Sequence, residues 1–327
     1  MSSFASLLGN LEETASKVKK CPSSDSGRNP QKNTRSHAEI PPRKKRRIQD
    51  LSQLRVQVSF LGIGAQKAGT SWLHEMLRRH PDLCLPQQKE IHFWDWQKHR
   101  RKGLGWYSDQ FPQGPKENLR GEITPCYCTL PEEDISEIKD IFPGLKIIFI
   151  ARDIVDRAYS ALVMELRNAV RGIPAGDFAI QDNVNKHDLD KFERDANPEK
   201  YSDDYFMDRL NHSTHKDRND YAKALRSWLK FVPESNLLIL NYEDISTRPK
   251  EALEEVCNHL GVQAQPLLDV LSNQELTLRV NATPSSGKGS TLRPSLKKKM
   301  EVELNPLTTE FNELLSDLNH SWKLKSD

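Results

Sequence analysis

The sequence predicts a three-layer α/β fold, with a central parallel sheet flanked by helices. Three apolar and β-branched runs, at residues 56–63, 146–151 and 237–241, have the composition of strands buried on both faces. A segment with helical periodicity follows each run, and strands that alternate with helices are typical of a parallel sheet covered on both sides. The 327 residues are enough for one large domain of this kind or for two smaller domains.

Residues 1–50 are expected to form a disordered basic tail, and residues 51–327 the folded domain. The tail is rich in Ser, Pro, Asn, Lys and Arg and lacks sustained apolar periodicity. Of the 48 basic and 46 acidic residues, the tail holds 11 and 5, so the rest of the chain carries a formal charge of −4. The folded domain is therefore not a general polyanion binder, and any basic site in it must be local.

The tail ends in five consecutive basic residues, 43–47, after two prolines. Such a run is typical of a nuclear-import signal or a nucleic-acid contact patch, and equally of a solvated basic linker. We expect nucleic acid or an import receptor as a partner only through this run.

The composition also predicts the compartment. No stretch approaches the roughly 20 consecutive apolar residues of a membrane span, so no membrane partner is expected. The five cysteines show no C-x-x-C spacing, which predicts neither a disulfide framework nor a zinc site. We expect a cytoplasmic or nuclear protein, although the Ser-rich basic tail leaves organelle targeting open.

The first strand leads into the glycine-rich segment 64–71, and a helix is expected from Thr70 to His80. In such a loop successive N–H groups converge on a phosphate or sulfate, and the positive end of the helix adds to the attraction. Lys67 and two hydroxyls complete the anion cradle. The arrangement is P-loop-like, but Thr70 stands where a Walker A motif has its lysine, which disfavours an ordinary ATPase or kinase.

The remaining elements follow the same pattern. An amphipathic helix is expected after the second strand, through Leu166, and another at about 249–260 after the third strand, with Gly261 as its C′ residue. The polar range 167–220 is interpreted as an excursion from the core that either shapes an acceptor pocket or is an inert surface insertion.

The glycine-rich segment resembles the donor loop of nucleotide-dependent sulfotransferases, in particular the branch of the heparan sulfate sulfotransferases. These enzymes use 3′-phosphoadenosine 5′-phosphosulfate (PAPS) as donor, and the resemblance covers about residues 56–322. It implies that Lys67 stabilises charge on the bridging oxygen as the S–O bond breaks. It also implies that the 5′-phosphosulfate is wrapped by a run of six residues, Gln66, Lys67, Ala68, Gly69, Thr70 and Ser71.

The second match is the strand at 147–153 with the following Arg157-Ala158-Tyr159-Ser160. By resemblance, Arg152 and Ser160 bind the 3′-phosphate of the donor, one through a charge-assisted bond and the other through a hydroxyl. Taken alone, Arg152-Asp153 is more typical of a surface ion pair.

The third match is the segment Lys89–Trp96, followed by Gly103-Leu104-Gly105-Trp106-Tyr107. The resemblance assigns Glu90 as the base that removes the acceptor proton, with His92 in reserve, and burial is expected to raise the pKa of Glu90 toward the working pH. Lys89, Asp95 and Trp96 are expected to contact the acceptor substrate. The alternative is a strand or loop with a salt-bridged glutamate and core aromatic residues.

Two departures from the family pattern weaken an assignment to heparan sulfate itself. Ile123 stands where the heparan branch commonly has a lysine. Lys288 and Gly289 match a loop over the adenine and 3′-phosphate, but the adjacent arginine is missing, and Arg293 is a candidate replacement.

The resulting hypothesis is a sulfotransferase that moves a sulfonate group from PAPS to a hydroxyl or amine of a small-molecule or glycan acceptor, without a metal. One alternative is an atypical P-loop kinase or NTPase. The other is a catalytically silent nucleotide-binding protein with a nuclear partner.

Overall fold

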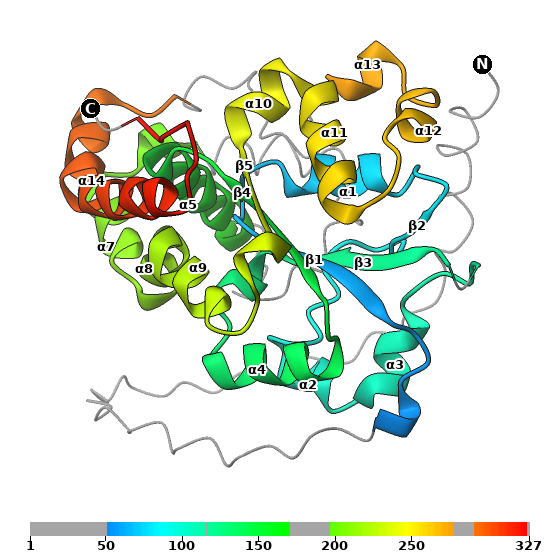
Figure 1. The fold of residues 1–327 in the computed structure, drawn as a ribbon. Coiled ribbons are helices and arrows are strands. Elements are labelled where there is room, and N and C mark those ends of the chain that lie inside the picture. Colours follow the sequence, from blue (N-terminus) through cyan, green and yellow to red (C-terminus); the bar gives the residue numbers. More distant parts are fainter. Residues whose placement is uncertain (1–50, 116, 171–196, 278–290, 326–327) are drawn as a thin grey trace, which may run out of the picture. The chain divides into compact units, whose positions relative to one another are not determined.

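The computed structural model describes residues 51–115, 117–170, 197–277 and 291–325 (Figure 1). The chain divides into two compact units, 1–46 and 47–327, and all described residues belong to the second. The basic run 43–47, Lys288 and Gly289 lie outside the described residues, so the roles assigned to them stay predictions.

A five-stranded parallel sheet in the order β2-β3-β1-β4-β5 forms the centre of this unit. Strand β1 (Val58–Gly64) lies between β3 (Leu119–Ile123) and β4 (Lys146–Ala151). The outer strands are β2 (Leu83–Cys84) and β5 (Leu237–Asn241). The three predicted strands are β1, β4 and β5, and the predicted α/β class with a parallel sheet is confirmed.

Strands β2 and β3 were not predicted from the sequence. Strand β2 has only two residues, and β3 carries Arg120, Gly121 and Glu122 in place of an apolar run. Gly121 is required by packing, because a Cβ atom there would lie 2.3 Å from the ring of Phe60 on the adjacent strand. The strand therefore depends on its neighbours rather than on its own β propensity.

Helices cover both faces of the sheet (Figure 1). Helices α1 (Thr70–Leu77) and α11 (Pro249–Leu260) lie on one face, and α4 (Glu132–Ile141) and α9 (Tyr221–Leu229) on the other. The prediction of α11 is confirmed, including Gly261 in the left-handed conformation with φ 84°.

The remaining helices are mostly short, and no helix in the described ranges is long and apolar enough to cross a membrane. The other α-helices are α2 (Gln97–Arg100), α3 (Gly103–Asp109), α5 (Ile154–Val170), α7 (Asp203–Leu210), α8 (Ser213–Asn219), α10 (Tyr242–Thr247), α12 (Gln265–Leu268), α13 (Asn273–Leu276) and α14 (Pro294–Asp317). The 3₁₀ helices are η1 (Leu51–Gln53), η2 (Pro125–Thr129), η4 (Pro198–Lys200) and η5 (Glu234–Asn236).

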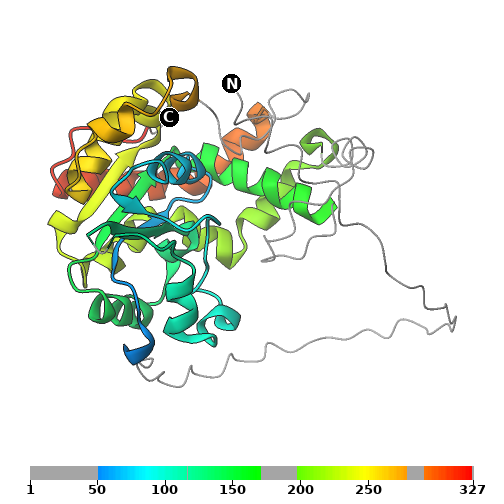
Figure 2. The same cartoon turned by 90° about the vertical axis from the view of Figure 1, so that its right-hand side faces the viewer.

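The polar range 167–220 contributes to the core in its described part. Helix α7 buries Phe206 and Leu210 in the main hydrophobic cluster. The long helix α14 packs against α5, α7 and α9 (Figure 2). Most of the polar residues of 198–220 lie on the exposed faces of short helices, whereas His215 and Asn219 on α8 are buried. A role of this range in shaping an acceptor pocket stays a prediction.

Candidate active site

The segment 64–71, here called the donor loop, joins the carboxyl end of β1 to α1. Ligands of parallel α/β folds commonly bind at this edge of the sheet. Gly69 is the N-cap of α1 in a left-handed conformation with φ 85°, and a Cβ atom there would lie 3.4 Å from the ring of Tyr242. The loop thus places the amino end of α1, with its partial positive charge, at the edge where an anion would bind.

Lys67 lies half-buried in the donor loop, with a left-handed φ of 70°. Burial, together with the positive charges of Arg152, Arg167 and Lys89, lowers the pKa of Lys67 to about 8. A bound anion would relieve the repulsion between these cations. The loop is therefore suited electrostatically to a phosphate or sulfate.

Arg152 follows β4 directly and reaches the donor loop. Its Nη1 donates to the backbone carbonyl of Lys67 at 2.9 Å, and its guanidinium lies 4.9 Å from the centre of the Tyr242 ring. The structure thus brings together the first two segments that the sequence singled out.

Ser160, the second residue predicted for the 3′-phosphate, lies half-buried on α5. The intervening Asp153 caps that helix, because its Oδ1 accepts the backbone N–H of Asp156 at 2.8 Å. The predicted pair therefore comes from one strand end and from the helix that follows it.

Arg218 on α8 is a site residue that the sequence analysis missed. Its guanidinium donates to Oε1 of Gln66 at 3.4 Å and to Sγ of Cys126 at 3.5 Å. Arg218 adds a further cation beside the donor loop. It belongs to the polar range 167–220, where periodicity gave no signal, and only the tertiary fold reveals its position.

The segment 89–96, here called the carboxylate loop, holds alternating charges in contact with one another. Lys89 Nζ donates to Oε1 of Glu90, and Oε2 of Glu90 lies 3.4 Å from Nε2 of His92. Nδ1 of His92 lies 2.8 Å from Oδ2 of Asp95. Glu90 and His92 both adopt left-handed φ angles, 65° and 53°, which is unusual for residues other than glycine.

The His92 ring is buried between its two carboxylate partners. Burial opposes its charge, but the bonds to Asp95 and Glu90 outweigh burial and raise the pKa of His92 to about 9. His92 is therefore a cation at neutral pH. The ring also stacks on half-buried Trp96 at 4.1 Å between centroids.

The expectation that burial raises the pKa of Glu90 is wrong for the ligand-free protein. Burial does favour a raised value, but the charge of Lys89 and the hydrogen bonds from His92 and Lys89 outweigh it and lower the pKa of Glu90 to about 2. Glu90 is thus ionised across the neutral range. It also lies close enough to Lys67 to raise the pKa of that lysine, which places the two loops beside each other.

Lys89, Asp95 and Trp96 were predicted as substrate contacts. In the structure all three contact Glu90 or His92, so they hold this pair in place. Any contact with an acceptor stays a prediction.

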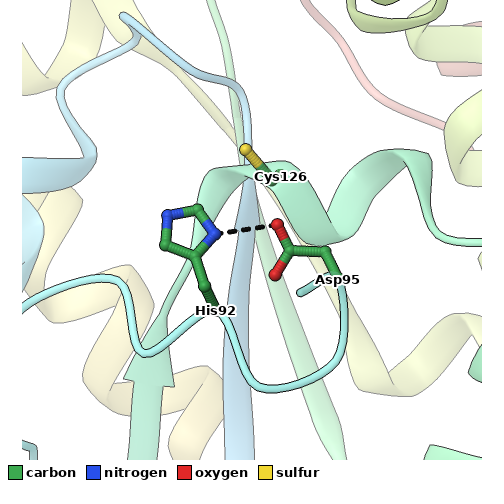
Figure 3. A group of neighbouring side chains, drawn as sticks. All are labelled: His92, Asp95 and Cys126. Atoms are coloured by element: carbon green, nitrogen blue, oxygen red, sulfur yellow. Dashed lines mark hydrogen bonds and ion pairs between the residues drawn. The ribbon is translucent and has the colours of Figure 1, made fainter. Parts of the chain in front are cut away.

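Cys126 joins His92 and Asp95 in a group that could hold a metal ion, with one ligand atom from each within 4.8 Å of the others (Figure 3). A metal would have to displace the proton on His92, whose pKa is about 9. It would also have to displace the thiol proton of Cys126, whose pKa burial raises to about 12, next to the cation of Arg218. We expect this group to hold protons rather than a metal at neutral pH.

Ile123 and Arg293, the residues at which the sequence departs from the family pattern, both make contacts within the protein. Ile123 is fully buried and would lie 2.8 Å from a Cβ atom on Gly62. Arg293, the candidate replacement for the missing arginine, is bonded to Asp203 and donates to the carbonyls of Pro198 and Tyr201 at 3.2 and 2.8 Å. Its guanidinium is already engaged by protein oxygens.

Comparisons with known proteins indicate a single family. The family model described as "Sulfotransferase domain" matches residues 59–283. Mouse heparan sulfate glucosamine 3-O-sulfotransferase 5 is 28% identical over 200 residues, covering 61% of this chain and 52% of that protein. The membrane-associated sulfotransferase kil1 of Dictyostelium discoideum is 24% identical over 266 residues, covering 62% of this chain and 56% of that protein. The chain thus spans about half the length of these relatives.

A solved structure shares the fold. The sulfotransferase from Alicyclobacillus acidocaldarius superposes with a TM-score of 0.54 at 18% identity, covering 82% of this chain and 98% of that chain. The family match extends over more than half of the sequence and includes both the donor loop and the carboxylate loop. The chain therefore belongs to the sulfotransferase domain family.

Proposed function

We propose that the protein transfers a sulfonate group from PAPS to a hydroxyl or amine acceptor. The main support for the proposal is that two loops of different charge lie next to each other. The donor loop, which holds Lys67 and is contacted by Arg152, lies beside a carboxylate loop whose Glu90 is ionised.

The donor loop supplies the electrostatic part of the reaction. As the acceptor attacks sulfur, the S–O bond to the phosphate breaks and its electron pair leaves with adenosine 3′,5′-bisphosphate. The ammonium group of Lys67 and the amino end of α1 stabilise this developing negative charge. Arg152 would bind the 3′-phosphate from the end of β4, and Ser160 from α5.

Glu90, rather than His92, is the proton acceptor in this proposal. His92 already carries a proton at neutral pH, because its pKa is raised to about 9, whereas Glu90 is ionised. A pKa near 2 makes a weak base, but the negative charges of a bound donor would raise it and strengthen the base. His92 then serves as a fixed cation that orients Glu90.

The proposed acceptor is a hydroxyl or amine of a glycan or a small molecule. The names of several relatives specify heparan sulfate glucosamine, which supports a glycan. Ile123 is buried in the core at the position where the resemblance gives the heparan branch a lysine, and this departure disfavours heparan sulfate itself as the acceptor.

An atypical kinase is the weaker candidate. Such an enzyme needs an acid that binds magnesium at the end of a core strand. The acid after β4 is Asp153, which caps α5. A silent nucleotide-binding protein would not require the paired charges that keep Glu90 ionised.

Transfer from ³⁵S-labelled PAPS to a panel of heparan oligosaccharides, phenols and amines tests the proposal. With an accepted substrate, Glu90→Gln should reduce turnover about 10²- to 10⁴-fold, because a general base is lost. Affinity for adenosine 3′,5′-bisphosphate should persist. Glu75→Gln is the matched control, since Glu75 pairs with Arg78 on the exposed side of α1.

Unchanged turnover in Glu90→Gln would remove Glu90 from its role. Magnesium-dependent hydrolysis of ATP by the wild-type protein, without sulfonate transfer, would overturn the proposal in favour of a kinase or NTPase.

A further inference from the structure

Glu122 on β3 is a buried carboxylate that the proposed reaction does not use. Its side chain accepts hydrogen bonds from three hydroxyl groups. Tyr107 and Tyr127 donate to Oε1 at 2.8 and 3.0 Å, and Thr124 donates to Oε2 at 2.7 Å. Buried carboxylates without a cationic partner are uncommon, so this group of hydroxyls requires an explanation.

The Tyr127 hydroxyl connects Glu122 to the carboxylate loop. Its oxygen accepts the backbone N–H of Phe93 at 3.0 Å and that of Trp94 at 3.4 Å. These two residues lie between His92 and Asp95, the ion pair of the loop. Tyr127 therefore holds the backbone at the turn that aligns the pair.

The direction of these hydrogen bonds depends on Glu122. A phenol hydroxyl has one proton to donate and lone pairs with which to accept. The carboxylate form of Glu122, which predominates above pH 7, can only accept. It therefore accepts the proton of Tyr127 and leaves the lone pairs of that hydroxyl directed to the two backbone amides. An apolar residue at position 122 would remove the acceptor that fixes this orientation.

We propose that Glu122 and Tyr127 are positioning residues that hold the carboxylate loop in its active geometry. The proposal rests on the proposed function for its catalytic consequence, but its structural part can be tested separately. Glu122 and Tyr127 act through the backbone at Phe93 and Trp94 on the alignment of His92 with Asp95 and Glu90.

Tyr107 provides a matched control. It donates to the same oxygen of Glu122 and is equally buried. Its contacts with the loop are with side chains rather than with the backbone. The ring centroids lie 4.6 Å from Phe93 and 5.7 Å from Trp94, and the Tyr107 hydroxyl also interacts with the side chain of Trp94. Tyr107→Phe removes a hydroxyl from Glu122 but leaves the hydroxyl that accepts the two backbone amides.

The first measurement is the titration of His92 by NMR in histidine-labelled protein, with the signal assigned by its loss in His92→Gln. In the wild-type protein the pKa should be about 9. Tyr127→Phe should lower it by about one unit, because the ring moves out of register with its carboxylate partners. Tyr107→Phe should leave it unchanged.

The second measurement is turnover at pH 8, since burial raises the pKa of Glu122 to about 7 and its carboxylate form predominates above that value. Tyr127→Phe should lower kcat about tenfold, the effect of one misplaced buried hydrogen bond, with the donor KM unchanged. Tyr107→Phe should have a smaller effect.

If Tyr127→Phe does not fold, a second pair of variants, at Glu122, tests the same proposal. Glu122→Leu should lower both the pKa of His92 and kcat. Glu122→Gln should restore them, because its amide oxygen still accepts from Tyr127. Failure of glutamine to restore either value would contradict the proposal.

The inference is overturned if Tyr127→Phe matches the wild-type protein in both measurements, or if Tyr107→Phe has an equal effect. A lowered pKa of His92 in Tyr127→Phe, together with no sulfonate transfer by the wild-type protein, would support the positioning role and refute the proposed function.

Discussion

The donor loop and the carboxylate loop lie beside each other but differ in their local charge. In the donor loop Lys67 is surrounded by Arg152, Arg167 and Lys89, and this crowding adds to burial in lowering its pKa. In the carboxylate loop positive and negative groups alternate in contact, from Lys89 to Glu90, His92 and Asp95. One loop has an excess of positive charge, and the other is balanced internally.

This difference assigns the two loops different tasks. Excess positive charge attracts a polyanion and is relieved only when the anion binds, so it favours the donor. A balanced set of charges has fixed geometry before any substrate arrives, which suits groups that must orient an acceptor.

Loss of the lysine in the donor loop should have the largest effect. Lys67→Ala should reduce sulfonate transfer about 10²- to 10³-fold, because a cation that stabilises the leaving group is lost. Single-turnover kinetics with labelled PAPS measures the change. Lys223→Ala, at an exposed pair with Asp217 on the surface, should retain wild-type activity, and an equal loss there would contradict a specific role for Lys67.

Arg152→Gln should weaken binding of adenosine 3′,5′-bisphosphate about 10- to 100-fold, as expected for a lost charge-assisted hydrogen bond to phosphate. Calorimetric titration provides the affinity. The control is Arg226→Gln, an exposed position on α9. If the two variants bind equally well, Arg152 has no part in the donor site.

Asp95→Asn tests the balance within the carboxylate loop. Removing the negative charge 2.8 Å from Nδ1 should lower the pKa of His92 from about 9 toward its usual 6.5, by about one unit or more. The raised pKa means that protonated His92 stabilises the folded state fully below pH 6.5, and this contribution is lost as pH rises through 9. Asp95→Asn should therefore be less stable than the wild-type protein at pH 6.5 and below, and the difference in the free energy of unfolding should shrink as pH rises to 9.

NMR titration of His92 and urea denaturation at several pH values check the prediction. Glu165→Gln is the control, because Glu165 faces His215 at 2.6 Å. A His92 titration that is unaltered in Asp95→Asn would show that the two side chains are not coupled.

The smallest expected effect is a gain in stability. Lys67→Met should stabilise the ligand-free protein by about 1 kcal/mol at pH 7, since it removes a crowded cation, with solvent screening of a half-buried group limiting the gain. The unfolded chain holds the lysine proton more tightly than the folded protein does. The destabilisation of the wild-type protein by charged Lys67 is therefore complete below pH 8 and decreases as pH rises toward 10.5. At that pH the free energies of unfolding of the variant and the wild-type protein should converge.

Urea denaturation at pH 7 and at pH 10 measures the difference. A variant less stable than the wild-type protein at pH 7 would show that Lys67 is well accommodated without an anion.

The features that could be predicted are those that depend on residues adjacent in the sequence. The apolar run of β1, the glycine at the N-cap of α1 and the order of charges in the carboxylate loop are all local, and the structure contains each of them. Strand β3 could not be predicted, because Gly121 and Glu122 lack β propensity and are fixed by packing against distant residues.

The same limit explains the site residues that were missed. Arg218 and Tyr242 reach the donor loop from helices far along the chain, and no local pattern marks them. The predicted shift in the pKa of Glu90 had the wrong direction because burial was considered without the charges of Lys89 and His92. The contacts with these residues depend on the left-handed φ angles of Glu90 and His92.

Calorimetric titration of the purified protein with adenosine 3′,5′-bisphosphate, and separately with ATP, tests whether the donor loop binds PAPS. We expect the bisphosphate to bind tightly without magnesium and ATP to bind weakly, because Lys67, Arg152 and backbone amides form the proposed site. Preference for ATP, or no binding of the bisphosphate, would contradict it.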